Sequence, residues 1–508
     1  MRAIILRLSL GLRISLGLAL PVCAPAYAQK TADTLRVAWR DAITVTDPYY
    51  NTQRTGLVLA LHVWDTLIYR DPETLQLKPL LATSWRYADD TTIEFTLRPG
   101  VTFHDGSAFT ADDVAYTINT VIADPRVSVP SNYAFLAGAE AIDDLHVRVR
   151  LKRVFPAALE YIAMVLPIWP HHYRERLGDA YAQAPSGTGP YRVTRVDGTA
   201  QIDLARNDAY FDSPKGRPAI GAITMRTVPD AAAEVSALLN NEADWIWDFP
   251  PDQLDVINRQ PTLQTYRSES MRVAYLNLDA AGRSGSGSPF TNLNVRRAVM
   301  YAIDRPALAR RFVPGGSRVL DAPCFPTQFG CDQGVATKYE YDPAKARALL
   351  AEAGMPEGFT TTLVGYVQPD WITAVSEYLA AVGIRADPLP LQVAPAVARS
   401  IAGQNPMEMG SWGSYSINDS SAFFPYFFAF SGQDYARDDT VRKLVDEAGA
   451  VVDPDRRRAL YADAIRRITA QAYFLPLFTY VKTYASVRTL VFKPFGDELP
   501  RFYLSSWR

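Results

Sequence analysis

Two stretches of the chain alternate apolar and polar residues, as a β-strand with one buried face does. In residues 91–97 (TTIEFTL) the apolar positions are Ile93, Phe95 and Leu97. In residues 145–151 (LHVRVRL) every second residue is apolar. This alternation predicts two half-exposed strands, and residues 34–39 (TLRVAW) have the composition of a third strand.

Other stretches carry the spacing and the start signals of helices. In residues 110–122 (TADDVAYTINTVI), Thr110 can cap the helix and Asp113 stands at the capping-box offset. The predicted buried stripe is Val114, Ile118 and Val121. Residues 341–356 and 452–468 each carry Asp-Pro at their second and third positions, a cap followed by a first-turn proline. Helices that alternate with strands predict an α/β fold.

The length of the chain predicts more than one lobe. The protein has 508 residues, whereas a single hydrophobic core stops growing at roughly 250–300 residues. Apolar residues make up 48% and charged residues 21%, as in soluble globular proteins. The formal net charge is −2, which argues against a nucleic-acid partner because phosphates require a basic face.

The first 28 residues have the layout of a secretory signal peptide. Three arginines precede a short apolar run at 14–22, and Ala26-Tyr27-Ala28 forms a cleavage site. A membrane anchor would need about 20 apolar residues, so we favour the signal peptide over an anchor. We therefore expect an exported, periplasmic protein.

Two cysteines remain after the signal peptide, Cys324 and Cys331 in PCFPTQFGCD. In an exported Pro/Gly-rich loop this pair predicts a disulfide. Closing so short a loop contributes roughly 2.5 kcal/mol of stability. A metal site is less favoured, because two cysteines supply too few ligands and no histidine lies nearby.

The sequence contains no catalytic motif. It has no HExxH, no G-x-S-x-G and no Walker A sequence, so we expect neither an enzyme nor a bound cofactor or metal. His171 and His172 are adjacent, and on a helix adjacent side chains are expected to point about 100° apart rather than to one metal ion. An exported hydrolase stays as an alternative from another functional class.

Residues 410–430 (GSWGSYSINDSSAFFPYFFAF) combine many aromatic rings with Gly, Ser, Asn and Pro. We expect the first half to be a strand-to-loop corner that presents Trp412 and Tyr415 to a ligand. The spacing of the phenylalanines predicts a helix that packs beneath it. They are Phe423, Phe424, Phe427 and Phe428.

Five segments in order resemble a known family. They are LKPLLATSWRYADDTTIEFTLRPGVTFHDGSAFTADDVAYTI (77–118), GTGPYRV (187–193), NNEADWI (240–246), NVRRAVMYAIDR (294–305) and YDPAKARALLAEAG (341–354). Together they resemble the dipeptide, oligopeptide and nickel-binding proteins of bacterial ABC importers, extracellular solute-binding protein family 5. The second segment is similar to the G-T-G-P-Y motif of that family.

The resemblance implies a two-lobed periplasmic-binding-protein fold with an additional domain and a ligand cleft between the lobes. Lobe I would comprise 29–60, 185–275 and 481–508. The extra domain would be 61–184 and lobe II 276–480. Such a monomeric receptor delivers its solute to a membrane permease that separate ATPase subunits drive.

The resemblance also suggests ligand-binding residues. Where peptide-binding members carry an Asp that pairs with the ligand ammonium group, this chain has Tyr415. Asp419 could substitute for that acid, or it could be a solvated turn residue. The full candidate set is Trp412, Tyr415, Tyr133, Tyr366, Gln368, Trp247 and Asp419. For Trp247 a core position fits equally well.

The expected solute is a short peptide or a peptide-like compound. A metal-chelate member of the same family is the nearest alternative, although the chain has only five histidines and none in the aromatic segment. A sensory or chaperone-like binding protein without a transport role stays open.

Overall fold

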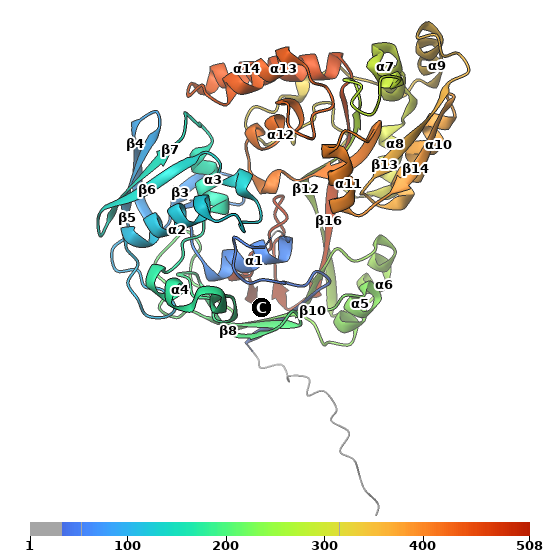
Figure 1. Cartoon of the computed structure of the whole chain (residues 1–508). Helices are drawn as coiled ribbons and strands as arrows, with labels where there is room; N and C mark the ends of the chain where they lie inside the picture. The colour runs from blue at the N-terminus through green and yellow to red at the C-terminus, as the bar shows by residue number, and fades with distance from the viewer. Residues whose placement is uncertain (1–32, 52, 314) are drawn as a thin grey trace, which may run out of the picture.

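The computed structural model describes residues 33–51, 53–313 and 315–508. The predicted signal peptide, residues 1–28, lies outside the described residues. Within them the chain has the predicted α/β architecture, with two lobes and an additional sheet domain (Figure 1). None of the described helices combines the length and the apolar character needed to cross a bilayer.

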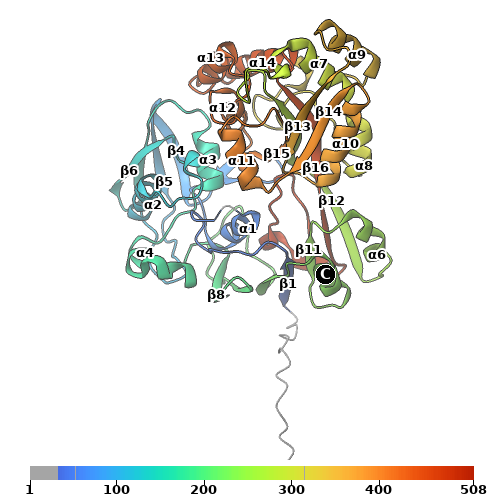
Figure 2. The ribbon, with the colours of Figure 1, turned by 45° about the vertical axis from the view of Figure 1, so that its right-hand side comes forward.

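One ten-stranded sheet runs through both lobes. In spatial order its strands are β14 (Ile384–Pro390), β13 (Phe359–Gly365), β15 (Met407–Trp412), β12 (Leu263–Leu278), β16 (Phe474–Val487), β11 (Trp245–Trp247), β1 (Thr34–Trp39), β10 (Ala222–Thr227), β9 (Gln201–Arg206) and β8 (Tyr191–Asp197). The long antiparallel strands β12 and β16 cross from one lobe to the other (Figures 1 and 2).

The pairing of β12 with β16 is interrupted where the strands leave one lobe for the other. The segment 263–269 pairs with 481–487, and 273–277 pairs with 474–479 after a register shift. Residues 270–272 therefore lie at the crossing. The predicted limits of lobe II, at 276 and 480, stand close to this interruption.

The additional domain is built on a four-stranded sheet. Its order is β4 (Ala82–Asp89), β5 (Thr92–Leu97), β7 (His146–Leu151) and β6 (Leu136–Asp143). The alternation along β5 and β7 is confirmed, because Ile93, Phe95, Leu97, Val147 and Val149 are buried. Two two-stranded sheets complete the strands. They are β2 (Ile68–Arg70) with β3 (Leu77–Pro79), and β17 (Leu490–Val491) with β18 (Ser506–Trp507).

The helices of the additional domain and lobe I include the predicted capped helix, α2. Thr110 and Asp113 form its capping box, and the buried stripe is as predicted. The helices of this half are α1 (Arg54–Val63), α2 (Ala111–Ala123), α3 (Ala158–Val165), α4 (His171–Leu177), α5 (Ala231–Leu239) and α6 (Leu254–Asn258).

Lobe II carries the other two predicted Asp-Pro helix starts. Asp342 accepts a hydrogen bond from the N–H of Lys345, and Asp453 accepts one from the N–H of Arg456. The helices of this lobe are α7 (Leu293–Ala302), α8 (Arg305–Phe312), α9 (Pro343–Glu352), α10 (Pro369–Ala380), α11 (Val393–Ile401), α12 (Phe424–Phe428), α13 (Asp439–Ala448) and α14 (Pro454–Ala470).

The predicted phenylalanine helix is the short α12. Phe423 stands just before it, and the four predicted side chains, Phe423, Phe424, Phe427 and Phe428, are all buried in one aromatic core with Phe474. A separate core joins lobe I to the additional domain. Ile417, which follows β15 in lobe II, is fully buried in that second core. Lobe II therefore reaches into the opposite half of the molecule at this point.

Candidate ligand-binding site

The segment after β15 turns in a left-handed backbone conformation, and we call residues 412–419 the corner. Ser414, Tyr415 and Ser416 have φ angles of 50°, 49° and 64°. A left-handed conformation costs an L-residue roughly 1–2 kcal/mol, because Cβ crowds the following carbonyl oxygen. Three such residues in succession need support from neighbouring groups, as is common at functional sites.

Much of that support comes from the opposite half of the molecule. Ser416 Oγ donates to the backbone oxygen of Asp497 over 2.7 Å and accepts from Nη1 of Arg54 at 2.8 Å. Arg70 donates to the backbone oxygen of Ser416. The N–H of Asn418 donates to the carboxylate of Glu160 at 2.7 Å. The corner is thus held by residues of lobe I and of the additional domain.

The loop that contains the two cysteines holds the corner from its own lobe. Gln328 Nε2 donates to the backbone oxygen of Ile417 at 2.9 Å. The N–H of Phe329 donates to the backbone oxygen of Asn418 at 3.0 Å. Cys324 and Cys331 flank these residues with their Cα atoms 5.8 Å apart, within the range of a disulfide.

Trp412 lies half-buried at the start of the corner. Its ring stacks on Tyr426 with centroids 4.2 Å apart and meets the edge of Tyr415 at 5.6 Å. Its indole N–H donates to the backbone oxygen of Ala422 at 3.3 Å. The α12 region thus packs beneath the corner and fixes the orientation of the indole ring.

Tyr415 and Tyr133 line the same pocket. Its other walls include Tyr49, Leu57, Trp64 and Met164 from lobe I and the additional domain, with the basic residues Arg70, Lys215 and Arg501. Burial raises the pKa of Tyr415, so this phenol is neutral at physiological pH. Tyr133 donates its hydroxyl to the backbone oxygen of Val165 at 2.9 Å, which fixes its ring in the wall. Aromatic walls with a few polar groups are typical of small-solute sites.

Tyr366 lies beside the strand that leads into the corner, but it does not line that pocket. Its hydroxyl is 2.7 Å from the hydroxyl of Tyr275 and donates to the backbone oxygen of Ser411 at 3.3 Å. Both hydroxyls would come within 2.5 Å of a Cβ at position 410, so this place in β15 requires Gly410. Tyr366 thus contacts the backbone that carries Trp412.

Two other candidates, Gln368 and Trp247, also lie apart from the pocket. Gln368 is exposed at the start of α10. Trp247 is buried in the core of lobe I, with its ring 5.9 Å from that of Trp39 and 5.8 Å from that of Trp245. This position agrees with the expectation that Trp247 belongs to the hydrophobic core rather than to the ligand-binding site.

Asp419 is neither solvated nor open to the pocket. Its carboxylate accepts two hydrogen bonds from Arg457, at 2.7 and 2.6 Å, and the pair is buried. The same carboxylate caps a short turn by accepting the N–H of Ser421. The reading of Asp419 as a solvated turn residue is therefore wrong. Asp419 does cap a turn, as expected, but its carboxylate is buried in an ion pair with Arg457 at the end of the corner.

Sequence reasoning missed the charged groups at the base of the corner. Glu498 accepts from Arg54 at 3.0 Å and from Arg272 at 3.1 Å. Asp497 accepts from Arg70 at 2.9 Å and from Arg501 at 2.7 Å. The sequence shows Asp497 and Glu498 as neighbours in a C-terminal segment rich in aromatic residues, and this is a weak local signal for a buried charged group. Nothing in the sequence relates Glu498 to Arg54, which stands 444 positions earlier.

Both of these buried acids are held in the charged form. Burial alone would raise the pKa of Glu498, but the positive charges of Arg272, Lys482 and Arg54 hold it well below its usual range. The guanidinium groups of Arg501 and Arg70 likewise lower the pKa of Asp497 against the effect of burial.

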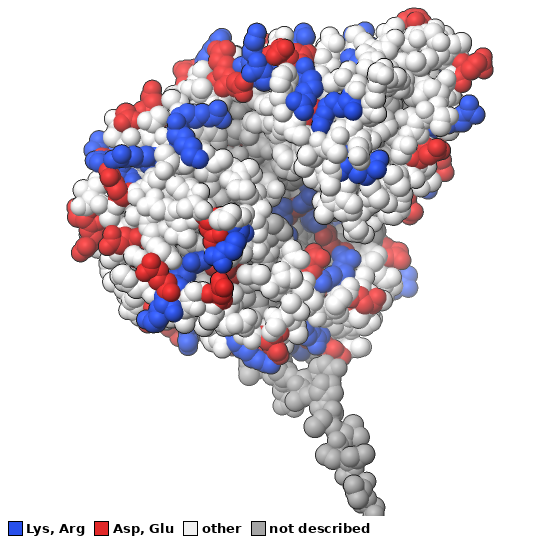
Figure 3. All heavy atoms as spheres, viewed as in Figure 1, with Lys and Arg blue, Asp and Glu red and all other residues white. Residues whose placement is uncertain are grey.

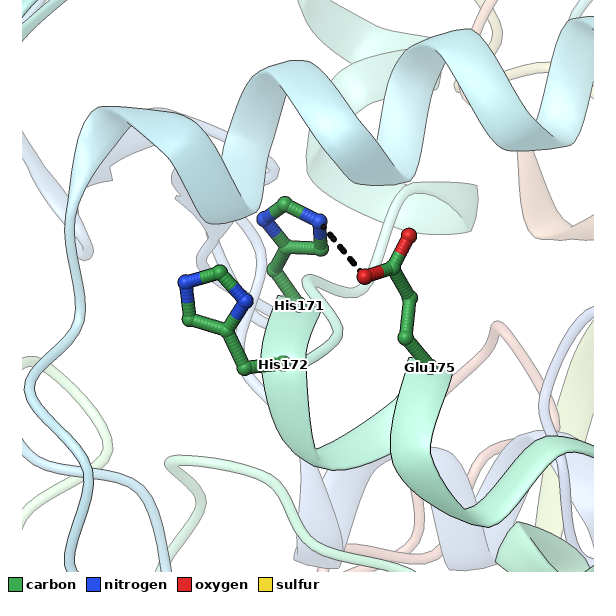
Figure 4. A group of neighbouring side chains, drawn as sticks. All are labelled: His171, His172 and Glu175. Carbon is green, nitrogen blue, oxygen red and sulfur yellow. Dashed lines mark ion pairs between the residues drawn. The ribbon is translucent and has the colours of Figure 1, made fainter.

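A group of possible metal ligands lies on α4, away from this pocket. It consists of His171, His172 and Glu175, with His171 Nε2 3.3 Å from Glu175 Oε2 (Figure 4). The expectation that the two histidines diverge is wrong. Their rings stack with centroids 4.4 Å apart, and His171 also stacks on Tyr116 at 4.3 Å. Rotation of the side chains in the first helical turn allows this stacking despite the backbone offset.

Comparison with known proteins adds the family. The protein family described as "Bacterial extracellular solute-binding proteins, family 5 Middle" matches residues 76–434 of this chain. The chain is 29% identical over 485 residues to the glutathione-binding protein GsiB of Pectobacterium atrosepticum, with 90% of each chain covered.

Two solved structures have the same fold. HbpA2 from Haemophilus parasuis superposes with a TM-score of 0.80 at 23% identity, over 94% of this chain and 100% of that one. DppA from Helicobacter pylori, in complex with the peptide STSA, gives 0.78 at 23% identity, over 93% and 98%. Because the family match spans more than half of its length, the chain belongs to the bacterial extracellular solute-binding proteins of family 5.

Proposed function

We propose that this protein is an exported receptor of an ABC importer that binds a short peptide or a peptide-like solute between its lobes and delivers it to a membrane permease. The observation that carries the proposal is the corner of lobe II, which inserts Tyr415 and Ile417 into the opposite half of the molecule. A solute bound at this place would contact both lobes, so its binding energy would favour their closure.

The known relatives support the class of solute. A relative that covers most of this chain is named as a glutathione-binding protein, and one structural neighbour was solved with a peptide. These proteins are named for binding rather than for catalysis, which supports a receptor over an exported hydrolase. The histidine group on α4 lies outside the pocket, so it gives the metal-chelate alternative no support.

A melting experiment tests the solute class. The mature protein is mixed with reduced glutathione and a panel of di- and tripeptides, and calorimetry follows each compound that raises the melting temperature. We expect at least one compound to raise it, because a solute that binds the folded state alone stabilises that state. Mass spectrometry of a solute that co-purifies gives an independent identification. If no compound shifts the melting temperature and no solute co-purifies, the proposal is wrong.

Nickel binding needs its own control, because the exposed group on α4 can bind metal ions outside the pocket. Nickel with and without free histidine is titrated into the wild type and into the His171→Ala/His172→Ala variant. We expect any nickel signal to disappear in the variant. A signal that persists there and requires the chelator would favour the metal-chelate alternative.

Transport and location need separate measurements. We propose a periplasmic monomer whose partners are an inner-membrane permease and its ATPase subunits. Cell fractionation tests the periplasmic location, and light scattering tests the monomeric state. Crosslinking to membranes in the presence of the bound solute tests the partnership with the permease and ATPase subunits. Recovery in the cytoplasm, or absence of any transporter subunit among the crosslinked proteins, would contradict this assignment.

A further inference from the structure

Two arginines share one carboxylate at the base of the corner, and we call them the arginine pair. Arg54 Nη2 and Arg272 Nη2 both donate to the same oxygen of Glu498, at 3.0 and 3.1 Å. Arg54 begins α1 in lobe I, whereas Arg272 lies where β12 crosses between the lobes. Glu498 has a left-handed φ of 61°, a conformation that few non-glycine residues adopt.

The arginine pair lies against the start of the corner. A Cβ at position 413 would be 3.2 Å from Nη2 of Arg272 and 3.5 Å from Nη2 of Arg54. Gly413 stands between Trp412 and Tyr415 in the chain, so the two guanidinium groups lie beside the backbone that joins these aromatic residues. A side chain at position 413 would fill the space that adjoins both cations.

The charges around the pair do not balance. Lys482 pairs with Asp248, Arg70 pairs with Glu160 and Asp497, and Arg501 pairs with Asp497. Among the described residues, Glu498 is the one acid that forms an ion pair with both members of the arginine pair. Its side chain is only 2% exposed, whereas those of Arg54 and Arg272 are 16% and 27% exposed. The counter-ion is therefore covered, while both cations stay partly exposed.

Lys or Arg atoms are visible inside the hollow between the two lobes (Figure 3). Guanidinium groups that are partly removed from water bind carboxylates strongly, because the planar fork of N–H donors matches two carboxylate oxygens. Tyr415 adds no negative charge to the corner, since burial keeps its phenol neutral.

We infer that the solute carries an acidic group, and that Arg54 and Arg272 bind this group at the corner and select acidic solutes over neutral ones. The inference rests on the proposed receptor function and deepens it. The pair would exchange part of its contact with Glu498 for contact with the solute.

The test uses probes matched in shape and different in charge. Reduced glutathione is compared with glutathione amidated at its glycine carboxylate alone, which has no net charge, and Ala-Glu-Ala with Ala-Gln-Ala, by calorimetry on the full mature protein. We expect each acidic probe that binds to do so about tenfold more tightly than its neutral partner. We also expect the affinity of the acidic probes to fall as salt rises, because salt screens charge pairs that stay partly exposed.

Variants of the pair and of its counter-ion separate recognition from a structural role. Arg272→Gln and Arg54→Gln should each remove most of the preference for the acidic probe. Glu498→Gln should tighten binding of the acidic probe, because it removes the competing anion and keeps the shape. A purely structural role predicts weaker binding of both probes in all three variants. Arg456→Gln is the matched control, because Arg456 pairs with Glu447 at the surface of α14.

The outcomes distinguish this inference from the function on which it rests. If neutral probes bind as tightly as acidic ones, the inference is wrong and the receptor function stands. The same conclusion holds if Arg54→Gln and Arg272→Gln both leave the preference unchanged. If no probe and no member of the peptide panel binds, the inference and the proposed receptor function are both wrong. Circular dichroism of each variant establishes that it is folded before its affinity is compared.

Discussion

Ser416 of lobe II donates its hydroxyl hydrogen to the backbone oxygen of Asp497 in lobe I, with 2.7 Å between the two oxygens. The same hydroxyl accepts a hydrogen bond from Arg54, so one small side chain joins the lobes through two contacts. Ser416 is buried and has a left-handed φ of 64°. These contacts stabilise the arrangement in which lobe II closes on lobe I.

Ser416→Ala should shift the protein toward an open form. The change removes both hydrogen bonds of the hydroxyl and leaves the donor of Arg54 without this acceptor. We expect a larger radius of gyration in small-angle scattering without solute, and a solute affinity lowered about fivefold. Ser376→Ala is the control, because its hydroxyl donates to Ala386 within lobe II. An unchanged radius and affinity would show that these bonds do not bias closure.

Trp412→Ala and Tyr415→Ala should weaken solute binding without unfolding the protein. Tyr415 lines the pocket, and Trp412 fixes its position through an edge-to-face contact. We expect Kd to rise about tenfold in each variant, since an aromatic contact of this kind contributes roughly 0.5–1.5 kcal/mol beyond its buried area. Titration calorimetry measures this change.

A matched change outside the pocket controls for the loss of a ring. Tyr341→Ala removes an exposed tyrosine of the same lobe and should leave Kd unchanged. An affinity that stays at the wild-type value in both corner variants would remove Trp412 and Tyr415 from the site.

The sequence predicts those parts of the fold that depend on local pattern. The capping box of Thr110 with Asp113 and the alternation in β5 are each set within a few residues, and both are present. The same holds for the phenylalanines of α12, which are buried as their spacing predicts. Such features follow from periodicity and from hydrogen bonds between near neighbours.

The site is harder to predict because it depends on contacts between distant segments. Arg54 and Glu498 meet only after both lobes have formed, and so do Ser416 and Asp497. Asp419 has the local sequence of a solvated turn, but Arg457 on α14 buries it in an ion pair. The family resemblance located the corner, whereas its charged surroundings required the tertiary structure.

Reduction of the cysteine pair should loosen the corner as well as lower stability. Gln328 and Phe329, between Cys324 and Cys331, hold the backbone of Ile417 and Asn418. An intact disulfide contributes roughly 2.5 kcal/mol by restricting the unfolded chain. We therefore expect dithiothreitol to lower both the melting temperature and the solute affinity.

The Cys324→Ser/Cys331→Ser variant is the matched control for reduction. It should resemble the reduced wild type, and dithiothreitol should not change it further. Thiol titration of the unfolded wild-type protein shows whether the two cysteines are oxidised. Two free thiols in protein purified from the periplasm would contradict the predicted disulfide.

His62 makes the stability of lobe I depend on pH. It is fully buried, its Nδ1–H donates to the backbone oxygen of Val58 at 2.7 Å, and its Nε2 accepts the N–H of Phe502 at 3.0 Å. Burial lowers its pKa from 6.5 to about 3, because the charged imidazolium would lose its hydration. The folded protein therefore holds the neutral ring over most of the acidic range.

Protonation of His62 in the unfolded chain should destabilise the fold as the pH falls below 6.5. Between pH 6.5 and about 3 the unfolded state binds the proton and the folded state does not, so stability rises with pH across this window. From these values, about 2 kcal/mol of the free energy of unfolding is lost between pH 8 and pH 5.

Urea unfolding of wild type and His62→Gln at both pH values measures this loss. The stability difference between the two proteins should shrink by about that amount at pH 5, because only the wild type carries the titrating ring. A stability difference between wild type and His62→Gln that is equal at both pH values would refute the assignment.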